Sequence, residues 1–417
     1  MIEALQKKID LVASGKGNIS DLLDELVLQA FYQNSSDLHM EPTESKDMKI
    51  RFRVDGILEE VATVKSTVVD ELIFVIKVRS KLRTDVHFSP QDGRVFFQIE
   101  DLNNEDKVVK IDARISILPL SYGEKVVMRL LYKENRALTL VELGFLKDDL
   151  SRVVRGYTAP YGLILATGPT GSGKTTTLYS ILSVINTPEI NITTIEDPIE
   201  YSIAGVNHIQ VNTKANLTFA SGLRSILRQD PDVIMVGEVR DAETAKITIN
   251  SALTGHLVLS TIHANNAIST IPRLLNLEID PFLIATTVNV IISQRLGRRL
   301  CTNCKRGFQL KESPVEREMI KLRPDIAKHL KDSDVLYKAQ GCEKCRNTGY
   351  KGRVGLYEVL EITARLRDTL SRTTNIEDIL KAAREDGFKL LIEDGIEKLK
   401  MGVIDIFELI KVTSIRE

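Results

Sequence analysis

A glycine-rich segment carries the clearest chemical signature in this chain: Gly168-Pro169-Thr170-Gly171-Ser172-Gly173-Lys174-Thr175, which fits the pattern G-x-x-x-x-G-K-[ST]. An apolar run, 162–167, precedes the segment and a predicted helix, 176–185, follows it, so its N–H groups are expected at a helix N-terminus. We expect this loop and Thr176 to bind ATP, with Lys174 reaching the β- and γ-phosphates and Thr175 binding Mg²⁺. The alternative is a glycine-rich turn that binds no ligand.

Two further strand ends carry carboxylates that suit nucleotide chemistry. Glu238 follows the apolar run 233–236, and this placement suits a base that activates water. The segment 194–200 ends another predicted strand, and we expect Glu196 to take part in catalysis and Glu200 to hold Mg²⁺. The alternative for Glu238 is a solvated side chain at the tip of an ordinary buried strand.

Two histidines, His256 and His263, flank a fourth predicted strand, 257–261. A lone histidine is often structural, and this reading stays open for both residues. The position of His263 at the end of the strand makes it a candidate for sensing phosphate or polarising water.

These candidates need a scaffold that brings strand ends together. Four short β-rich runs end in one of these groups and each leads into a helix: 162–167, 191–195, 233–236 and 257–261. This alternation predicts a parallel sheet covered by helices, because parallel strands require crossover connections.

The N-terminal third has a different pattern. Between residues 49 and 131, alternating apolar runs and turn signals such as Asp55-Gly56 predict an α+β domain with one helix near 69–82. Ser20 is expected to cap a helix over 21–31. We expect six parts in all: an N-terminal tail (1–18), an N-terminal α+β domain (19–136), a connector (137–158), a P-loop ATPase core (159–296), a tetracysteine module (297–355) and a C-terminal helical region (356–417).

All four cysteines of the chain lie in two C-x-x-C pairs: Cys301, Cys304, Cys342 and Cys345. Four thiolates would form a closed tetrahedral Zn²⁺ site with a structural role. The gap between the pairs is long, so we expect the intervening loop to carry a helix at about 314–330. A redox-active cysteine pair is the alternative.

Composition narrows the remaining possibilities. The chain has 417 residues, which is enough for about three domains, and its formal net charge is −1. The longest apolar stretches are too short to span a membrane and no secretory signal is recognisable, so we expect a soluble protein of the cytoplasm. No Trp and 5% aromatic residues argue against base stacking, and no nucleic-acid partner is expected.

Taken in order, these motifs resemble the ATPases of type II secretion and type IV pilus assembly (the GspE/PilB group). The resemblance runs from about residue 21 to the C-terminus. It is carried by the phosphate loop, the two cysteine pairs and six further motifs: Ser36-Asp37-Leu38-His39-Met40-Glu41-Pro42, Arg51-Phe52-Arg53-Val54-Asp55-Gly56, Pro90-Gln91-Asp92-Gly93-Arg94, Gly123-Glu124-Lys125-Val126-Val127-Met128-Arg129, Arg228-Gln229-Asp230-Pro231-Asp232 and Gly237-Glu238-Val239-Arg240-Asp241.

The resemblance implies an α/β fold. It consists of a RecA-like P-loop core, an N-terminal α+β (PAS-like) domain, a tetracysteine zinc module and a helical C-terminal region. It also implies a hexameric ring whose sites lie between the N- and C-terminal domains. By the same resemblance Arg114, Arg129 and Arg224 supply positive charge to the γ-phosphate, a task that suits guanidinium groups. A surface ion pair is the alternative for each arginine.

The function implied is an Mg²⁺-dependent motor that powers pilus assembly or secretion from the cytoplasmic face of the inner membrane. Its implied partners are further copies of the chain, an inner-membrane platform protein and a cytoplasmic docking protein. The tetracysteine element favours assembly over retraction. A nucleic-acid motor, a conjugation or competence DNA-uptake ATPase and a nucleotide-gated scaffold are the alternatives.

Two features leave the docking mode open. Members of the family usually carry an additional N-terminal domain, whereas about 18 residues precede the first predicted helix of the α+β domain here, as in a truncated chain or a shorter branch. A basic cluster, Arg295, Arg298 and Arg299, is expected on a solvated helix face or on a surface that meets the machine.

Overall fold

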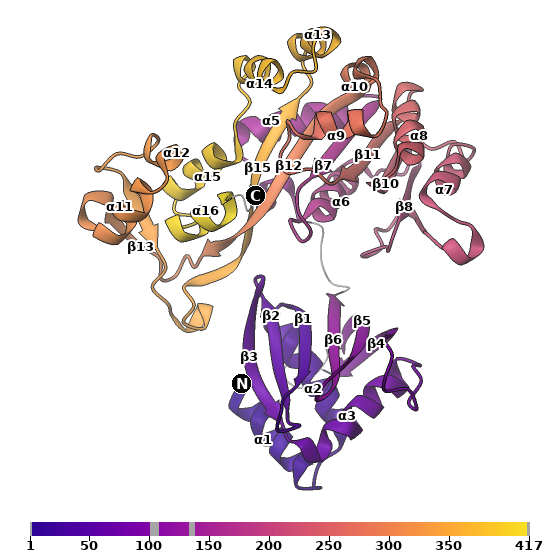
Figure 1. Ribbon diagram of the computed structural model, residues 1–417, viewed down its shortest axis with the longest axis vertical. Coiled ribbons are helices and arrows are strands. Elements are labelled where there is room, and N and C mark those ends of the chain that lie inside the picture. The colour runs from indigo at the N-terminus through magenta and orange to yellow at the C-terminus, as the bar shows by residue number, and fades with distance from the viewer. Residues whose placement is uncertain (1, 101–107, 133–137, 415–417) are drawn as a thin grey trace. The chain divides into compact units, whose positions relative to one another are not determined.

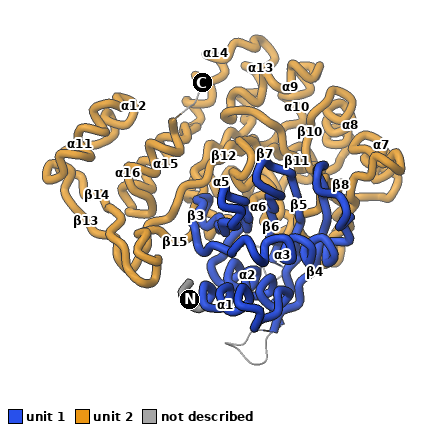
Figure 2. Tube along the Cα trace, turned by 60° about the horizontal axis from the view of Figure 1, so that its bottom comes forward, with its two compact units in different colours: residues 1–135 blue, residues 136–417 orange. Residues whose placement is uncertain are grey.

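The computed structural model describes residues 2–100, 108–132 and 138–414, and it divides the chain into two compact units, Met1–Asn135 and Arg136–Glu417 (Figure 2). No buried residue is shared between the core of unit 1 and the three cores of unit 2 in these described ranges.

Unit 1 is an antiparallel sheet with helices on one of its faces (Figure 1). The strand order is β3-β2-β1-β6-β5-β4. The strands are β1 (Ser35–Pro42), β2 (Met48–Val54), β3 (Ile57–Val64), β4 (Gln91–Glu100), β5 (Val108–Leu120) and β6 (Gly123–Tyr132). The helices are α1 (Ile2–Ala13), α2 (Ile19–Tyr32) and α3 (Ser66–Arg79).

Alternation along the strands separates the two faces of this sheet. In β2, Ile50 and Phe52 are fully buried in the helix-covered core, while Arg51 and Arg53 point to the other face. The helix expected at 69–82 is confirmed as α3.

Two details near the N-terminus differ from expectation. The cap of α2 is Asn18, whose side chain accepts the N–H of Ser20 at 2.8 Å, so the expected cap at Ser20 is wrong by two residues. The physical reason is that Ile19 is buried and is drawn into the helix with the rest of its apolar face. Helix α1 packs Leu5 and Ile9 into the same core, although the sequence placed it in a separate tail.

Unit 2 is a seven-stranded sheet with helices on both faces, in the order β15-β12-β7-β11-β10-β8-β9. All neighbours are parallel except β12 and β15. The four predicted strands are present as β7 (Gly162–Thr167), β8 (Ile192–Glu196), β10 (Val233–Val239) and β11 (Leu257–Ile262). Three strands of this sheet were not predicted: β9 (Val206–Gln210), β12 (Val288–Leu300) and β15 (Tyr350–Glu361).

The two faces of this sheet carry different helices. One core contains residues of α7 (Phe219–Ile226), α8 (Ala242–Leu253), α9 (Thr270–Asn276), α10 (Pro281–Thr287), α13 (Ala364–Arg372) and α14 (Ile376–Glu385). The other contains residues of α4 (Leu140–Leu143), α5 (Lys147–Thr158) and α6 (Lys174–Ile185). The short helix η1 (Thr213–Ala215) lies between β9 and α7.

The cysteine module and the C-terminal helices form the remaining part of unit 2. The module holds β13 (Arg306–Gln309), η2 (Leu310–Glu312), α11 (Pro314–Lys321), α12 (Pro324–Ala327), β14 (Val335–Lys338) and η3 (Glu343–Cys345), followed later by α15 (Leu391–Lys400) and α16 (Ile406–Thr413). The single helix expected at 314–330 is therefore wrong. It is split at Pro324, which cannot donate a helical N–H bond and disfavours helical geometry at Arg323.

Among the described residues, we find no helix whose length and apolar character would let it cross a lipid bilayer.

Candidate nucleotide site and metal centre

The phosphate loop joins the end of β7 to the start of α6, as its motif predicts. Gly168 has a φ of +137°, and a Cβ there would lie 2.4 Å from the carbonyl oxygen of Gln294. A side chain is therefore excluded by both strain and space. The loop ends at Gly173, and Lys174 is the first residue of α6, so loop N–H groups gather at a helix N-terminus.

Lys174 lies folded over its own loop. Its Nζ donates to the carbonyl oxygens of Gly168 at 2.9 Å and Pro169 at 3.1 Å. Burial lowers the pKa of Lys174, and the negative charge of Glu238 opposes this shift. The hydroxyl of Ser172 is buried without a hydrogen-bond partner. An unpartnered hydroxyl and a desolvated cation at a helix N-terminus fit the phosphates of a nucleotide.

Glu238 is placed by an irregularity in β10. The pairing of β10 with β11 shifts register between Val236 and Val239, and the hydroxyl of Thr261 donates to the carbonyl of Gly237 at 2.7 Å across the shift. The Glu238 carboxylate lies 2.6 Å from the guanidinium of Arg240 and 3.4 Å from Nε2 of His263. Three candidates from the sequence thus lie at the carboxyl ends of the parallel strands: Lys174, Glu238 and His263.

The loop that carries His263 is fixed by two buried groups. The hydroxyl of Thr167 donates to the carbonyl of Ala264 and accepts the N–H of Ala264, both at 3.0 Å. The N–H of Ala267 donates to the carboxylate of Glu358 at 2.9 Å. His256 lies before β11, at the other end of that strand, where its Nδ1 contacts the carbonyl of Ser251 at 2.9 Å.

Glu196 is buried in a hydrogen-bonded network. Its carboxylate accepts from the hydroxyls of Tyr179 at 2.5 Å and Thr194 at 2.6 Å, and lies 2.9 Å from Nδ1 of His208. Burial and the charge of Glu196 raise the pKa of Tyr179. These contacts hold Glu196 rigidly, and they were invisible in the sequence because His208 comes from β9. Glu200 lies in the segment that follows β8.

The three candidate arginines fall in both units. Arg224 lies on α7 of unit 2 and pairs with Glu243 at 2.5 Å, with both side chains more than half exposed. Arg114 and Arg129 are direct cross-strand neighbours on β5 and β6 of unit 1, and Nε of Arg129 lies 3.2 Å from the carboxylate of Asp37.

The four cysteines come together as expected. Their sulfurs all lie within 4.8 Å of one another. Individual Sγ–Sγ distances are 3.9 Å for Cys301–Cys342 and 3.7 Å for both Cys304–Cys345 and Cys342–Cys345. Four sulfurs bound at the usual Zn–S distance in a tetrahedron are about 3.8 Å apart, so the cluster fits zinc.

Hydrogen bonds to sulfur favour the thiolate form of two of these cysteines. Sγ of Cys345 accepts the N–H groups of Cys342 and Gly349, each at 3.2 Å. The side chain of Asn303 donates to Cys342 and lowers its pKa to about 6, whereas burial raises the pKa of Cys304 to about 11. A cation would be required to hold all four thiols deprotonated together.

The basic cluster lies on strand β12 and on no helix, so the expected solvated helix face is wrong. Arg298 forms hydrogen bonds from Nε at 2.8 Å and from its terminal nitrogen at 2.6 Å to the buried carboxylate of Glu408, and its guanidinium lies 3.7 Å from the ring centre of Tyr350. Arg295 donates to the carbonyl of Val412. Pairing with β7 and β15 over the whole strand overrides the local polar composition.

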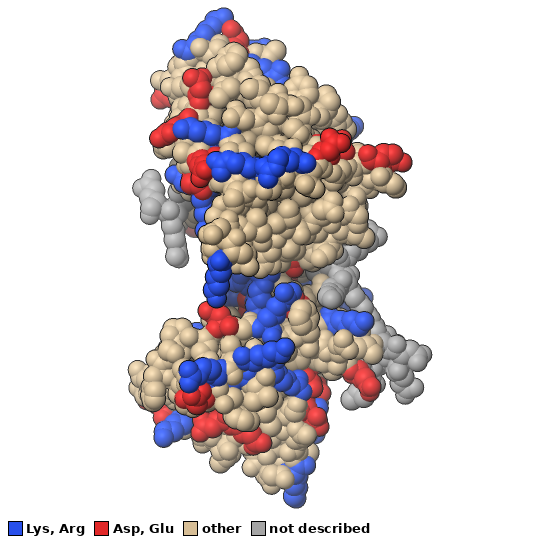
Figure 3. All heavy atoms as spheres, turned by 90° about the vertical axis from the view of Figure 1, so that its right-hand side faces the viewer, with Lys and Arg blue, Asp and Glu red and all other residues tan. Residues whose placement is uncertain are grey.

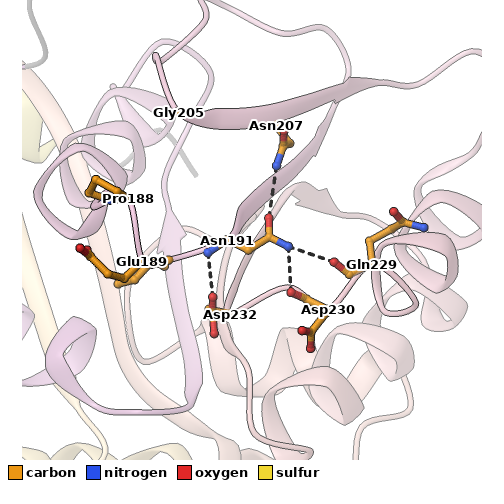
Figure 4. Close-up of a pocket in the computed structure, with 9 residues that line it drawn as sticks. Pro188, Glu189, Asn191, Gly205, Asn207, Gln229, Asp230 and Asp232 are labelled. Carbon is orange, nitrogen blue, oxygen red and sulfur yellow. Dashed lines mark hydrogen bonds between the residues drawn. The ribbon is translucent and has the colours of Figure 1, made fainter.

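A polar hollow of about 580 Å³ lies elsewhere in unit 2 (Figure 4). Asn191 and Asp232, which line it, come directly before β8 and β10. The hollow therefore lies at the amino ends of strands whose carboxyl ends carry the candidate nucleotide-site residues. Asn191 donates to the carbonyls of Gln229 and Asp230 at 2.9 and 2.8 Å. These bonds give the Arg228–Asp232 motif a structural role in shaping the loop before β10.

Positive and negative side chains are interspersed on the face of the molecule seen in Figure 3.

Comparison with known proteins supports the family resemblance seen in the sequence motifs. The family model for "Type II/IV secretion system protein" matches residues 12–411. The type IV pilus assembly ATPase PilB of Acinetobacter baylyi is 42% identical over 392 residues, which cover 94% of this chain and 66% of that protein. The type II secretion system ATPase E of Vibrio cholerae is 40% identical over 414 residues, covering 99% of this chain and 79% of that protein.

Solved structures show the same fold. The ATPase DotB of Legionella pneumophila has a TM-score of 0.65 at 21% identity, with 93% of this chain and 94% of that chain covered. The pilus retraction motor PilT has a TM-score of 0.59 at 22% identity, with 94% and 97% covered. The chain spans about two thirds of the length of the Acinetobacter PilB protein. The resemblance seen in the motifs is confirmed, and this chain belongs to the type II/IV secretion system protein family.

Proposed function

We propose that this chain is an Mg²⁺-dependent ATPase that acts as a motor in type IV pilus assembly or type II secretion. The observation that carries the proposal is the position of Glu238 at the end of β10, where its charge acts on Lys174 of the phosphate loop. A carboxylate that can activate water and a lysine that can bind phosphate are two of the groups that ATP hydrolysis with Mg²⁺ uses. The names of the relatives support the choice of machine.

The residues of unit 2 have distinct proposed roles. Lys174 exchanges its bonds to loop carbonyls for phosphate oxygens, and the Thr175 hydroxyl and Glu200 are the candidates for holding Mg²⁺, which would neutralise phosphate charge. Glu238 accepts the proton of the attacking water. His263 and Arg240 orient the Glu238 carboxylate, to which both lie close.

The arginines and Glu196 complete the proposed site. Arg114, Arg129 and Arg224 would add positive charge at the γ-phosphate, as guanidinium groups do in phosphoryl transfer. Glu196 would support the site from its buried network. Zinc in the four-cysteine cluster would be structural, because four thiolates leave no open coordination position.

We further propose the assembly in which this activity is used. The chain would form a homo-hexamer at the cytoplasmic face of the inner membrane and would contact a platform protein and a docking protein there. ATP binding would close the interface between domains, and hydrolysis and product release would open it and so produce force. The six-part division of the chain also stays a proposal.

Substitution Glu238→Gln tests the proposed chemistry. It keeps the size of the side chain but removes the base, so phosphate release should fall at least about 100-fold while binding of a fluorescent ATP analogue stays within a few-fold of wild type. Glu278→Gln is the matched control, because this carboxylate is exposed and pairs with Lys246 away from the loop. Wild-type turnover in Glu238→Gln would show that Glu238 is not the base.

A further inference from the structure

One side chain outside the phosphate-loop motif forms hydrogen bonds to a residue before Lys174 in the chain and to a residue after it. Gln294 lies on β12 and is 1% exposed. Its Nε2 donates to the carbonyl oxygen of Ser172 at 2.7 Å, and its Oε1 accepts the hydroxyl of Thr177 at 2.8 Å. Ser172 belongs to the loop and Thr177 to the first turn of α6, so this amide ties the two together.

Gln294 also lies against two glycines of the loop, one through its backbone carbonyl and one through its side-chain amide. A Cβ at Gly168 would meet the carbonyl oxygen of Gln294 at 2.4 Å, and a Cβ at Gly173 would meet its Nε2 at 3.1 Å. Both glycines have positive φ angles, +137° and +90°. The loop therefore closes directly against β12 at Gln294, with the side chain of Leu296 also 3.6 Å from a Cβ at Gly173, and no space is left there for intervening side chains.

The bond to Ser172 has a consequence for phosphate binding. In a trans peptide the C=O and N–H groups point in opposite directions. Because Gln294 holds the Ser172 carbonyl, the N–H of Gly173 in the same peptide is directed away from Gln294. An N–H fixed in this way is preorganised for an anion at the N-terminus of α6.

We propose that Gln294 is a positioning residue for nucleotide binding, which presets the Ser172–Gly173 peptide before the phosphates arrive. This inference rests on the proposed ATPase function. Gln294 takes no part in bond making or breaking, and its effect belongs to binding affinity. Loss of the Gln294 amide should weaken the binding of ADP and the binding of ATP to a similar degree, because the loop binds phosphate groups that both nucleotides carry.

The same strand provides a matched control. Asn289 on β12 also uses its amide to bond main-chain carbonyls, with Nδ2 donating to Tyr161 at 3.0 Å and Gly156 at 3.4 Å. These carbonyls lie before β7, at the end of that strand opposite the phosphate loop. Asn289→Ala should therefore lower stability without changing nucleotide affinity.

The experiment measures the Kd of fluorescent ADP and ATP analogues with Mg²⁺ for the full chain and three variants. Gln294→Met keeps the length and burial of the side chain but loses both hydrogen bonds. Gln294→Glu keeps the acceptor for Thr177 and places an oxygen against the Ser172 carbonyl. We expect Gln294→Met and Gln294→Glu each to raise the Kd about 10-fold or more, with the larger increase in Gln294→Glu. Asn289→Ala should leave the Kd within about 2-fold of the wild-type value.

The outcomes separate this inference from the function on which it rests. If the wild type binds neither nucleotide, the ATPase proposal fails. If the wild type binds and either folded Gln294 variant binds equally well, the positioning role is refuted, since packing alone would then suffice. An equal loss in Asn289→Ala would also refute it, because the effect would report general destabilisation of β12.

Discussion

At the scale of single residues, Glu41 shows how charged side chains pair on the face of the unit 1 sheet that its helices do not cover. Its carboxylate lies 2.7 Å from Nζ of Lys125 and also pairs with Arg51. Burial by itself raises the pKa of Glu41, but the hydrogen bonds from Lys125 and Arg51 outweigh burial and leave the pKa below its ordinary value of 4.5. Lys125 and Arg51 therefore stabilise the ionised form of the Glu41 carboxyl group.

This shift predicts a dependence of stability on pH. A lowered pKa means that the folded state binds fewer protons than the unfolded state near pH 4.5. The stabilisation is thus complete above that pH and is lost as the pH falls through the folded pKa. In Glu41→Gln, the free energy of unfolding at pH 7 should fall by about 1 kcal/mol, and its decrease below pH 4.5 should become shallower.

Urea unfolding at several pH values measures this effect. Glu60→Gln is the control, because its pair with Lys49 on the same unit is about half exposed and should change the pH profile little. Identical acid profiles for wild type and Glu41→Gln would contradict the account.

Candidate residues could be picked out where their motif is local in the sequence. Lys174 stands at a fixed position of the glycine-rich motif, and Glu238 stands close to the end of an apolar run, so both could be singled out as candidates from the sequence. Gln294 and His208 were missed, because their importance comes from hydrogen bonds to residues 122 and 12 positions away in the chain. No local pattern signals such contacts.

At the scale of elements, β12 and β15 connect the part of the sheet that carries the phosphate loop to the C-terminal part of unit 2. These antiparallel strands pair from Val290↔Glu361 to Leu300↔Tyr350, and β12 also pairs with β7 beside the phosphate loop (Figure 1). The sequence predicted the four strands that precede chemical groups but missed this pair. Residues 288–300 contain Ser293, Gln294 and three arginines, and their strand conformation depends on partners distant in the chain.

The contact between β12 and α16 should be a main source of stability in this region. Arg298→Ala removes two charged hydrogen bonds to the carboxylate of Glu408, which is 2% exposed. The buried carboxylate then keeps the backbone N–H of residue 298 at 2.8 Å and Lys411 at 3.8 Å, but it loses its guanidinium partner. We expect a loss of about 3–5 kcal/mol in the free energy of unfolding. Arg299→Ala, which loses one bond to the carbonyl of Glu142 at 3.3 Å, should cost less than about 1 kcal/mol in the same urea titration. Equal losses would contradict this assignment.

The cysteine module should depend on its metal for folding. We expect about one equivalent of zinc per chain by elemental analysis, and a lower thermal midpoint after removal by a chelator or in Cys342→Ser. A shift of about 5 °C or more is expected if the metal contributes folding energy. Less than about half an equivalent of any metal in protein purified without chelator would contradict the zinc site.

At the scale of the whole molecule, the chain consists of two units with separate hydrophobic cores. The phosphate loop, Glu238 and Arg224 belong to unit 2, whereas Arg114 and Arg129 belong to unit 1. Composition and alternation predicted an α+β part followed by a parallel α/β part. Strand β15 spans the boundary expected at residue 355, and helix α1, which lies in the expected tail, buries apolar residues in the core of unit 1.

The central claim is that the phosphate loop hydrolyses ATP. Phosphate release from Mg²⁺-ATP, measured at several protein concentrations, tests it most directly when wild type is compared with Lys174→Ala and with Lys246→Ala, an exposed lysine of the same unit. The account predicts turnover that Lys246→Ala retains and Lys174→Ala abolishes, with a specific rate that rises with concentration as rings assemble. Turnover in Lys174→Ala at the wild-type rate would contradict the assignment, as would a wild type that hydrolyses no ATP at any concentration.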